Sequence, residues 1–200
     1  MKPSIVVFDI GAVLVDWQPT RAWADELGSE KAAQEFIDRT NFMALNKRAD
    51  NGEAFADLAL EVTDPGDRQL FNTYISRFQH TVRDAVPGTW SIVDQLLARN
   101  VPLHGITNWS AETWPEGLKA HPRLDEIFGT LVISGREKMS KPEPGIYQLL
   151  CERADVAPED CVFIDDGLRN VKGAMDVGMD GIHFTDAAAL ARELSERGLL

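Results

Sequence analysis

The sequence predicts an α/β fold, a Rossmann-like parallel sheet with a small helical cap inserted after the first strand. Three observations indicate this fold. The chain opens with a β-branched apolar run, SIVVF, that is typical of a buried strand. Residues 16–85 then show helical patterning without strand alternation. From residue 101 onward, short apolar runs alternate with helical segments, which favours right-handed crossovers and a parallel sheet.

The first strand, SIVVFDIG, ends near Asp9, and helical segments follow it. These segments are PTRAWADEL, EKAAQEFIDRT, GEAFADLALEV and PGDRQLFNTYISRFQHTV, separated by Gly and Pro. The helix that completes the first strand–helix unit begins only near PGTWSIVDQLLA. We therefore expect residues 16–85 to form a helical cap over the strand ends, and residues 1–15 and 86–200 to form the α/β core.

Four strand–helix pairs complete the expected sheet. They are VPLHGIT before AETWPEGLKA, TLVIS before EPGIYQLLCERA, CVFID before LRNVKGAMDV, and GIHF before DAAALARELSER. The carboxyl ends of parallel strands meet at one edge of the sheet, where open α/β sheets bind their ligands. Polar residues that follow these strands are therefore the candidates for a functional site.

The composition excludes some classes of partner. The chain has 200 residues and a formal net charge of -12, which argues against a nucleic-acid or anionic-membrane partner, because both require a basic surface. Cys151 and Cys161 are too few for a disulfide framework. The first apolar run is too short for a secretory signal or a membrane span. We expect a soluble cytoplasmic protein, monomeric or homodimeric.

Polar residues at the strand ends suggest metal-assisted chemistry on an anion. In chain order they are Asp9, Thr107, Asn108, Lys141, Asp165 and Asp166. A carboxylate can attack phosphorus only when the negative charge of both partners is neutralised, which a divalent cation and a lysine can do. Three carboxylates are hard oxygen ligands suited to Mg²⁺. Thr107 and the amides near Asn108 are placed to donate hydrogen bonds to phosphoryl oxygens.

Four segments in this order, FDIGAVLVD, ITN, KPEPGIY and FIDDG, resemble the motifs of the haloacid dehalogenase superfamily of aspartate-nucleophile phosphohydrolases. The strings VDW, TWPE and KPEPGIYQ are most similar to small bacterial sugar-phosphate phosphatases of the α-D-glucose-1-phosphate phosphatase type. The resemblance implies that Asp9 is the nucleophile and that Thr107 and Lys141 hold the phosphoryl group. It also implies a magnesium site made of Asp9, Asp165, Asp166 and the backbone carbonyl of Gly11.

One position departs from the family pattern. Most phosphatases of the family carry a second aspartate two residues after the nucleophile, as the acid that protonates the leaving oxygen, and here that residue is Gly11. Loss of such an acid costs roughly 10²-fold to 10⁴-fold in rate for a poor leaving group. Asp16 is a candidate substitute, and a helix cap or hinge is its alternative role. Trp109 is the tryptophan we expect to contact the substrate.

The predicted function is a magnesium-dependent phosphomonoesterase that acts on a small phosphorylated metabolite, such as a sugar phosphate, through an aspartyl-phosphate. Two alternatives stay open. A metal-independent 2-haloacid dehalogenase would use the same aspartate and lysine, but Asp165 and Asp166 would then repel the nucleophile. A phosphate-binding or regulatory module with little turnover would follow if nothing replaces the acid missing at Gly11.

Overall fold

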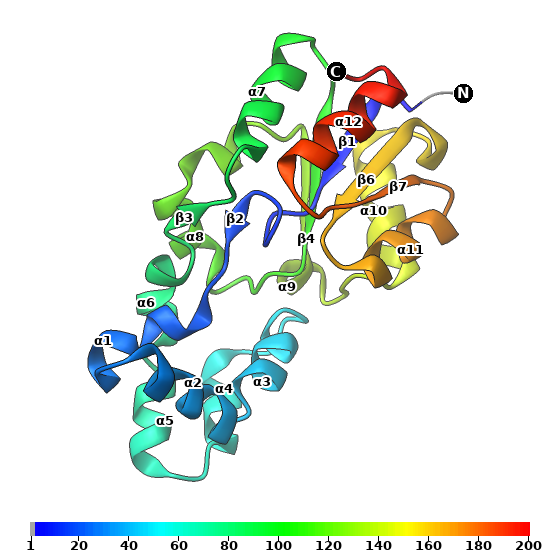
Figure 1. Cartoon of the computed structure of the whole chain (residues 1–200). Helices are drawn as coiled ribbons and strands as arrows, with labels where there is room; N and C mark the ends of the chain where they lie inside the picture. The colour runs from blue at the N-terminus through cyan, green and yellow to red at the C-terminus, as the bar shows by residue number, and fades with distance from the viewer. Residues whose placement is uncertain (1–2) are drawn as a thin grey trace.

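A five-stranded parallel sheet forms the centre of the computed structural model, which describes residues 3–200 (Figure 1). Its strands are β1 (Ile5–Phe8), β4 (Leu103–Thr107), β5 (Thr130–Ile133), β6 (Cys161–Asp165) and β7 (Asp180–His183), arranged in the order β5-β4-β1-β6-β7. The predicted parallel α/β sheet is thereby confirmed. The order reverses at β1, so β4 and β6 flank it and the carboxyl ends of all three lie together.

Helices cover both faces of the sheet. They are α7 (Thr89–Ala98), α8 (Trp114–Ala120), α9 (Ser134–Glu137), α10 (Pro144–Ala154), α11 (Leu168–Asp176) and α12 (Ala187–Arg197), with 3₁₀ turns at η3 (Pro122–Asp125) and η4 (Pro158–Asp160). Side chains of β1 alternate between two apolar clusters: Val6 and Phe8 face residues of α7 and α12, and Ile5 and Val7 face α10. Both faces of the sheet are therefore buried, as its continuous apolar strands require.

The helices between the short antiparallel strands β2 (Val15–Asp16) and β3 (Asp84–Ala85) form what we call the helical insert, residues 19–81. They are η1 (Pro19–Ala22), α1 (Ala24–Leu27), α2 (Glu30–Arg39), α3 (Phe42–Ala49), α4 (Phe55–Leu58), η2 (Ala59–Glu61), α5 (Pro65–Phe71) and α6 (Tyr74–Thr81). The β2–β3 pair joins both ends of the insert at the base. The expected limits of a separate cap domain, 16–85, stay a prediction.

Two details of the insert differ from the sequence patterning. The segment 65–82 is two helices, because the carbonyl of Leu70 accepts hydrogen bonds from the side chains of Trp23 and Thr73, which compete with the helix ladder. The second difference is α3, which the patterning did not predict. It begins at Phe42, directly after Asn41 in the left-handed conformation.

An aromatic cluster holds the insert together and extends to the sheet. Trp23 stacks on Tyr74 with ring centroids 5.2 Å apart, and both side chains are buried. Phe78 of α6 continues the cluster to Trp109, 5.3 Å away, in the loop after β4. Trp109 in turn contacts Trp114 of α8. The insert is thereby packed against the carboxyl edge of the sheet, where the polar residues lie (Figure 1).

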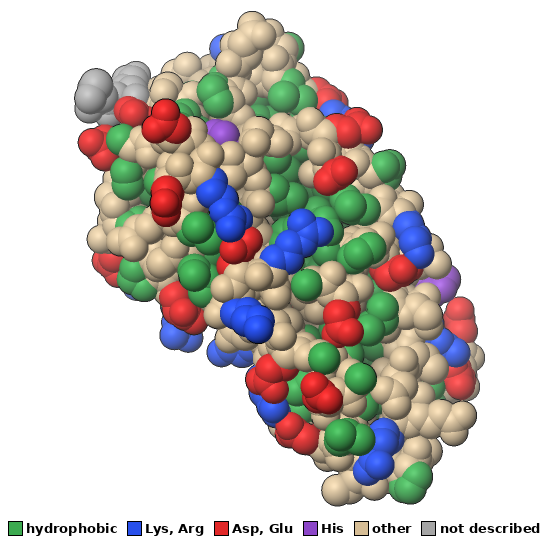
Figure 2. Space-filling model, turned by 180° about the vertical axis from the view of Figure 1, so that it is seen from behind, with side chains coloured by type: hydrophobic (Ala, Val, Ile, Leu, Met, Phe, Trp, Pro, Cys, Tyr) green, Lys and Arg blue, Asp and Glu red, His purple; other side chains and the backbone are tan. Residues whose placement is uncertain are grey.

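The surface shows no gathering of basic residues on the face drawn in Figure 2, where Lys and Arg side chains are interspersed with Asp and Glu. Within residues 3–200, every helix is too short or too polar to cross a bilayer. Cys151 and Cys161 are both buried free thiols.

Candidate active site

Three carboxylates meet at the carboxyl edge of the sheet. Asp9 follows β1, Asp165 is the last residue of β6, and Asp166 comes directly after it. One oxygen from each lies within 4.8 Å of the others. Asp9 and Asp165 are buried, whereas Asp166 is exposed. This arrangement follows from the pairing of β1 with β6, which aligns Phe8 with Ile164 and so brings the residues after them together.

Lys141 reaches this cluster from the loop between α9 and α10. Its Nζ lies 2.8 Å from Oδ1 of Asp9 and 2.6 Å from Oδ2 of Asp165, and its side chain is buried. The ammonium therefore bridges two acids that come from neighbouring strands. An ion pair exposed to water would stabilise the fold little. These charges are buried, so removing one of them would leave the others unpaired at a high cost in stability.

Two residues at the carboxyl end of β4 lie beside the lysine. Asn108 exchanges hydrogen bonds with the backbone of Lys141: its Nδ2 donates to the carbonyl at 3.1 Å and its Oδ1 accepts from the amide at 2.9 Å. Thr107, the last residue of β4, is buried next to it. The structure thus brings all six predicted strand-end residues to one edge of the sheet.

The loop after β6 is held by a further set of hydrogen bonds. Oδ1 of Asp165 accepts from the amide of Gly167 at 2.7 Å and from Nδ2 of Asn170 at 2.9 Å. Nε2 of His183, at the end of β7, donates to the backbone carbonyl of Asp166 at 2.9 Å. Both oxygens of Asp165 are therefore engaged, one by this loop and one by Lys141. The sequence did not predict this contact of His183, because it depends on the pairing of β7 with β6.

The cluster carries more negative than positive charge. Burial raises the pKa of Asp9 to about 8; Lys141 acts in the opposite direction, and Asp165 and Asp166 add to the rise. Burial by itself lowers the pKa of Lys141, but Asp9 and Asp165 outweigh it and the net pKa is raised. One lysine is thus set against three carboxylates, all of them hard oxygen donors. The donor set fits Mg²⁺, whose charge would offset the remaining repulsion.

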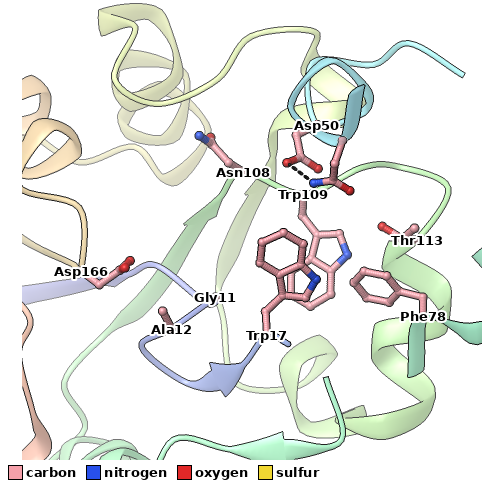
Figure 3. A pocket seen from close by; sticks show the side chains of 10 residues that line it. Gly11, Ala12, Trp17, Asp50, Phe78, Asn108, Trp109, Thr113 and Asp166 are labelled. Atoms are coloured by element: carbon pink, nitrogen blue, oxygen red, sulfur yellow. Dashed lines mark hydrogen bonds between the residues drawn. The ribbon is translucent and has the colours of Figure 1, made fainter. Parts of the chain in front are cut away.

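A cavity of about 220 Å³ adjoins the cluster at Asp166, between the sheet edge and the helical insert (Figure 3). Its lining residues are Gly11, Ala12, Trp17, Asn46, Asp50, Phe78, Asn108, Trp109, Thr113 and Asp166. Three aromatic side chains form one wall, and the indole Nε1 of Trp109 is buried without a hydrogen-bond partner among the described residues. A pocket of this size is small among ligand sites and suits a small molecule.

Some lining residues were expected from the sequence and others were not. Gly11, Asn108, Trp109 and Asp166 are in the first group. Asn46 and Asp50 are in the second, because they lie on and directly after α3, the helix that the patterning missed. Asp16, by contrast, is not among the residues that line the cavity. Its Oδ1 accepts from Nε2 of Gln18 at 2.8 Å, and its Oδ2 lies 3.8 Å from Arg21.

The sheet is parallel and carries clustered carboxylates and a buried lysine at its carboxyl edge, beneath a helical insert. This arrangement is typical of hydrolases in which an aspartate on a Rossmann-like sheet is the reactive group. The chain belongs to the haloacid dehalogenase-like hydrolases, since the model of that family matches residues 3–178. The family resemblance read from the four motifs is thereby confirmed, and with it the prediction that the protein is a hydrolase.

Several characterised proteins are similar to this chain. A sesquiterpene phosphatase of Aspergillus oryzae is 26% identical over 95% of this chain and 94% of its own length. A fructose-1-phosphate phosphatase of Escherichia coli is 26% identical over 88% of this chain and 94% of its own. Among solved structures, a HAD family enzyme of Bacteroides thetaiotaomicron in complex with magnesium and inorganic phosphate is similar, with a TM-score of 0.70 and 17% sequence identity. The match covers 92% of this chain and 95% of that enzyme's chain. The structural likeness shows the shared fold.

Proposed function

We propose that this hydrolase is a magnesium-dependent phosphomonoesterase that acts on a small phosphorylated metabolite of the sugar-phosphate class. The observation that carries the proposal is the position of Asp9, which contacts the Lys141 ammonium and lies beside Asp165 and Asp166, the last of which lines the cavity. The names of the relatives, a fructose-1-phosphate phosphatase among them, support a phosphate ester as substrate.

In the proposed reaction, an oxygen of Asp9 attacks phosphorus and displaces the leaving oxygen, which forms an aspartyl-phosphate. Lys141, Thr107 and the amides near Asn108 hold the phosphoryl oxygens and stabilise the charge that spreads over them in the transition state. Water then attacks the phosphorus of the aspartyl-phosphate, which releases phosphate and restores Asp9. Attack by Asp9 requires its ionised form, although burial raises its pKa.

Asp9, Asp165 and Asp166, with the backbone carbonyl of Gly11, would hold Mg²⁺ in this proposal. The bound cation would supply positive charge to the phosphoryl group and keep Asp9 ionised. Without a cation, the exposed Asp166 and the buried Asp165 would repel an anionic substrate, which is why a metal-independent dehalogenase accounts for the site less well.

The lining of the cavity favours a substrate whose leaving group is small and uncharged. Lys and Arg are absent from the lining residues, so no second phosphate or carboxylate of a substrate would find a cation there. The aromatic wall of Trp17, Phe78 and Trp109 offers a flat apolar surface on which the apolar face of a sugar ring can pack. Substrate contact by Trp109 is part of the proposal.

The proposal places the protein in the cytoplasm, acting alone or as a homodimer on a free metabolite. The free thiols of Cys151 and Cys161 and the net charge of -12 support this, since an acidic chain repels nucleic acids and anionic membranes.

Phosphate release from a panel of esters tests the proposal. The panel contains sugar 1-phosphates, sugar 6-phosphates, a prenyl phosphate, p-nitrophenyl phosphate and a 2-haloacid, each with Mg²⁺ or with EDTA. We expect release from phosphate esters that requires Mg²⁺ and is abolished by Asp9→Asn. Halide release that persists in EDTA would instead favour the dehalogenase, and Mg²⁺ binding without any turnover would favour the binding module.

A further inference from the structure

Gly11 leaves an open space in the active site where a general acid would be expected. A Cβ atom built on Gly11 has no atom within 4 Å apart from those of Gly11 and its two chain neighbours, and Gly11 itself lines the cavity. The chain therefore has room for a proton donor beside Asp9 but places no side chain there. Asp16 does not fill this role in the structure, because it bonds to Gln18 and Arg21 and lies outside the cavity lining.

Asp50 faces the same cavity from the helical insert (Figure 3). Its Oδ2 accepts a hydrogen bond from Nδ2 of Asn46 at 3.1 Å. Its backbone carbonyl accepts from Oγ of Ser134 at 2.5 Å, and the same Oγ accepts from the amide of Trp109 at 2.9 Å. Asp50 is thus fixed to the loop that carries Asn108, although it belongs to the insert. One cavity connects its carboxyl to the open space at Gly11.

The surroundings of this carboxyl favour its protonated form. Burial raises the pKa of Asp50 to about 8, and a hydrogen bond from the backbone of Ser110 opposes the rise. The titratable groups that face it are Tyr74 of α6, whose own pKa burial raises so that it stays neutral, and Asp166 across the cavity. Among the described residues, Asp50 takes part in no ion pair that would hold it ionised.

We propose that Asp50 is the general acid and base of this active site, supplied by the helical insert in place of the residue missing at Gly11. The inference rests on the proposed function. While Asp9 bonds to phosphorus and the bond from phosphorus to the leaving oxygen breaks, the Asp50 carboxyl gives its proton to that oxygen. The resulting Asp50 carboxylate then takes a proton from the water that attacks the aspartyl-phosphate, so phosphate leaves and Asp50 is again protonated.

The proposal is tested by comparing how fast the variant Asp50→Asn hydrolyses esters with different leaving groups. This substitution leaves the shape of the side chain almost unchanged. We expect kcat for a sugar or alkyl phosphate to fall by about 10²-fold to 10⁴-fold. Release of p-nitrophenol in the first turnover should keep its rate, because this leaving group needs no proton. Later turnovers should be slow, with phosphorylated enzyme accumulating, since the water has lost its base.

Controls separate this role from a structural one. Asp16→Asn makes the same chemical change at the rival aspartate and should keep wild-type rates. The inhibition constant of inorganic phosphate should be the same in Asp50→Asn as in wild type; a damaged site would raise it and slow the first turnover too. Wild-type turnover of a sugar phosphate by Asp50→Asn would overturn the inference alone. A wild-type protein inactive on every ester would overturn the proposed function and this inference with it.

Discussion

The side chain of Asn108 forms two hydrogen bonds with the backbone of Lys141, one to its carbonyl at 3.1 Å and one from its amide at 2.9 Å. The two residues are 33 positions apart and belong to different loops at the sheet edge. Because both bonds are to backbone groups, they fix the point from which the lysine side chain starts. The ammonium is thereby held between Asp9 and Asp165.

Asn108→Ala should therefore lower activity through Lys141. We expect kcat/KM to fall by about 10-fold to 100-fold, the range found when an outer residue that orients a ligand is removed. The measurement is steady-state hydrolysis of p-nitrophenyl phosphate with saturating Mg²⁺. Asn72→Ala, at an exposed position after α5, is the matched control and should change nothing. Equal kinetics for both variants would contradict the positioning role of Asn108.

Lys141→Met should abolish detectable turnover and destabilise the fold at neutral pH. Removing one partner of a buried ion pair costs about 3–5 kcal/mol, because the remaining charges stay buried and unpaired. The loss should be larger at pH 9.5 than at pH 7, because above the pKa of about 8 that Asp9 has beside the lysine only the wild type pairs an ionised Asp9 with an ammonium. Urea unfolding at pH 7 and pH 9.5 measures this. A variant equally destabilised at both pH values would show that lost packing, and not charge, is responsible.

Mg²⁺ should stabilise the protein against heat. A ligand at a concentration of 100 times its Kd stabilises the folded state by about 2.7 kcal/mol, which for a domain of this size is a rise in Tm of roughly 5–10 °C. Asp166→Asn should reduce that rise, because it removes one of the three clustered carboxylates. Asp176→Asn, an exposed aspartate at the end of α11, makes the same charge change and should keep the full shift. An undiminished shift in Asp166→Asn would place the cation elsewhere.

Asp50 should make the folded state less stable as the pH rises. Its pKa is raised to about 8 in the folded protein and is about 3.9 in an unfolded chain, so the folded state binds more protons between these values. Stability contributed by the bound proton is therefore present below about pH 4 and lost as pH rises through 8. Asp50→Asn should be more stable than wild type at pH 8.5 and closer to it at pH 5. A difference that does not change with pH would contradict the raised pKa.

Much of the fold could be predicted because it depends on local patterns. The strands β1, β4 and β6 are buried on both faces, and each ends at, or directly before, the polar residue that reaches the site. Parallel pairing then requires Asp9, Thr107 and Asp165 to share one edge. The predicted strand-end residues were brought together for that reason, although the roles assigned to them stay predictions.

The sequence predicted that the insert is helical, but it did not predict all of the helices within it. The helix α3 has only eight residues and begins after a left-handed Asn41, so it lacks the long periodic pattern on which such predictions depend. It was missed for this reason, and Asn46 and Asp50 were missed with it. The break between α5 and α6 comes from Trp23, whose indole bonds to Leu70 47 positions away, which no local pattern reveals.

By itself, the sequence determined the parallel sheet, the family and the acidic edge, because strand periodicity and four ordered motifs are local properties of the chain. Tertiary structure alone decided which side chains of the insert face that edge. Asp50 meets the cavity only because the aromatic cluster and the Ser134 hydrogen bond dock the insert on the loop after β4. The state of its proton also depends on that docking, since burial by distant segments sets its pKa.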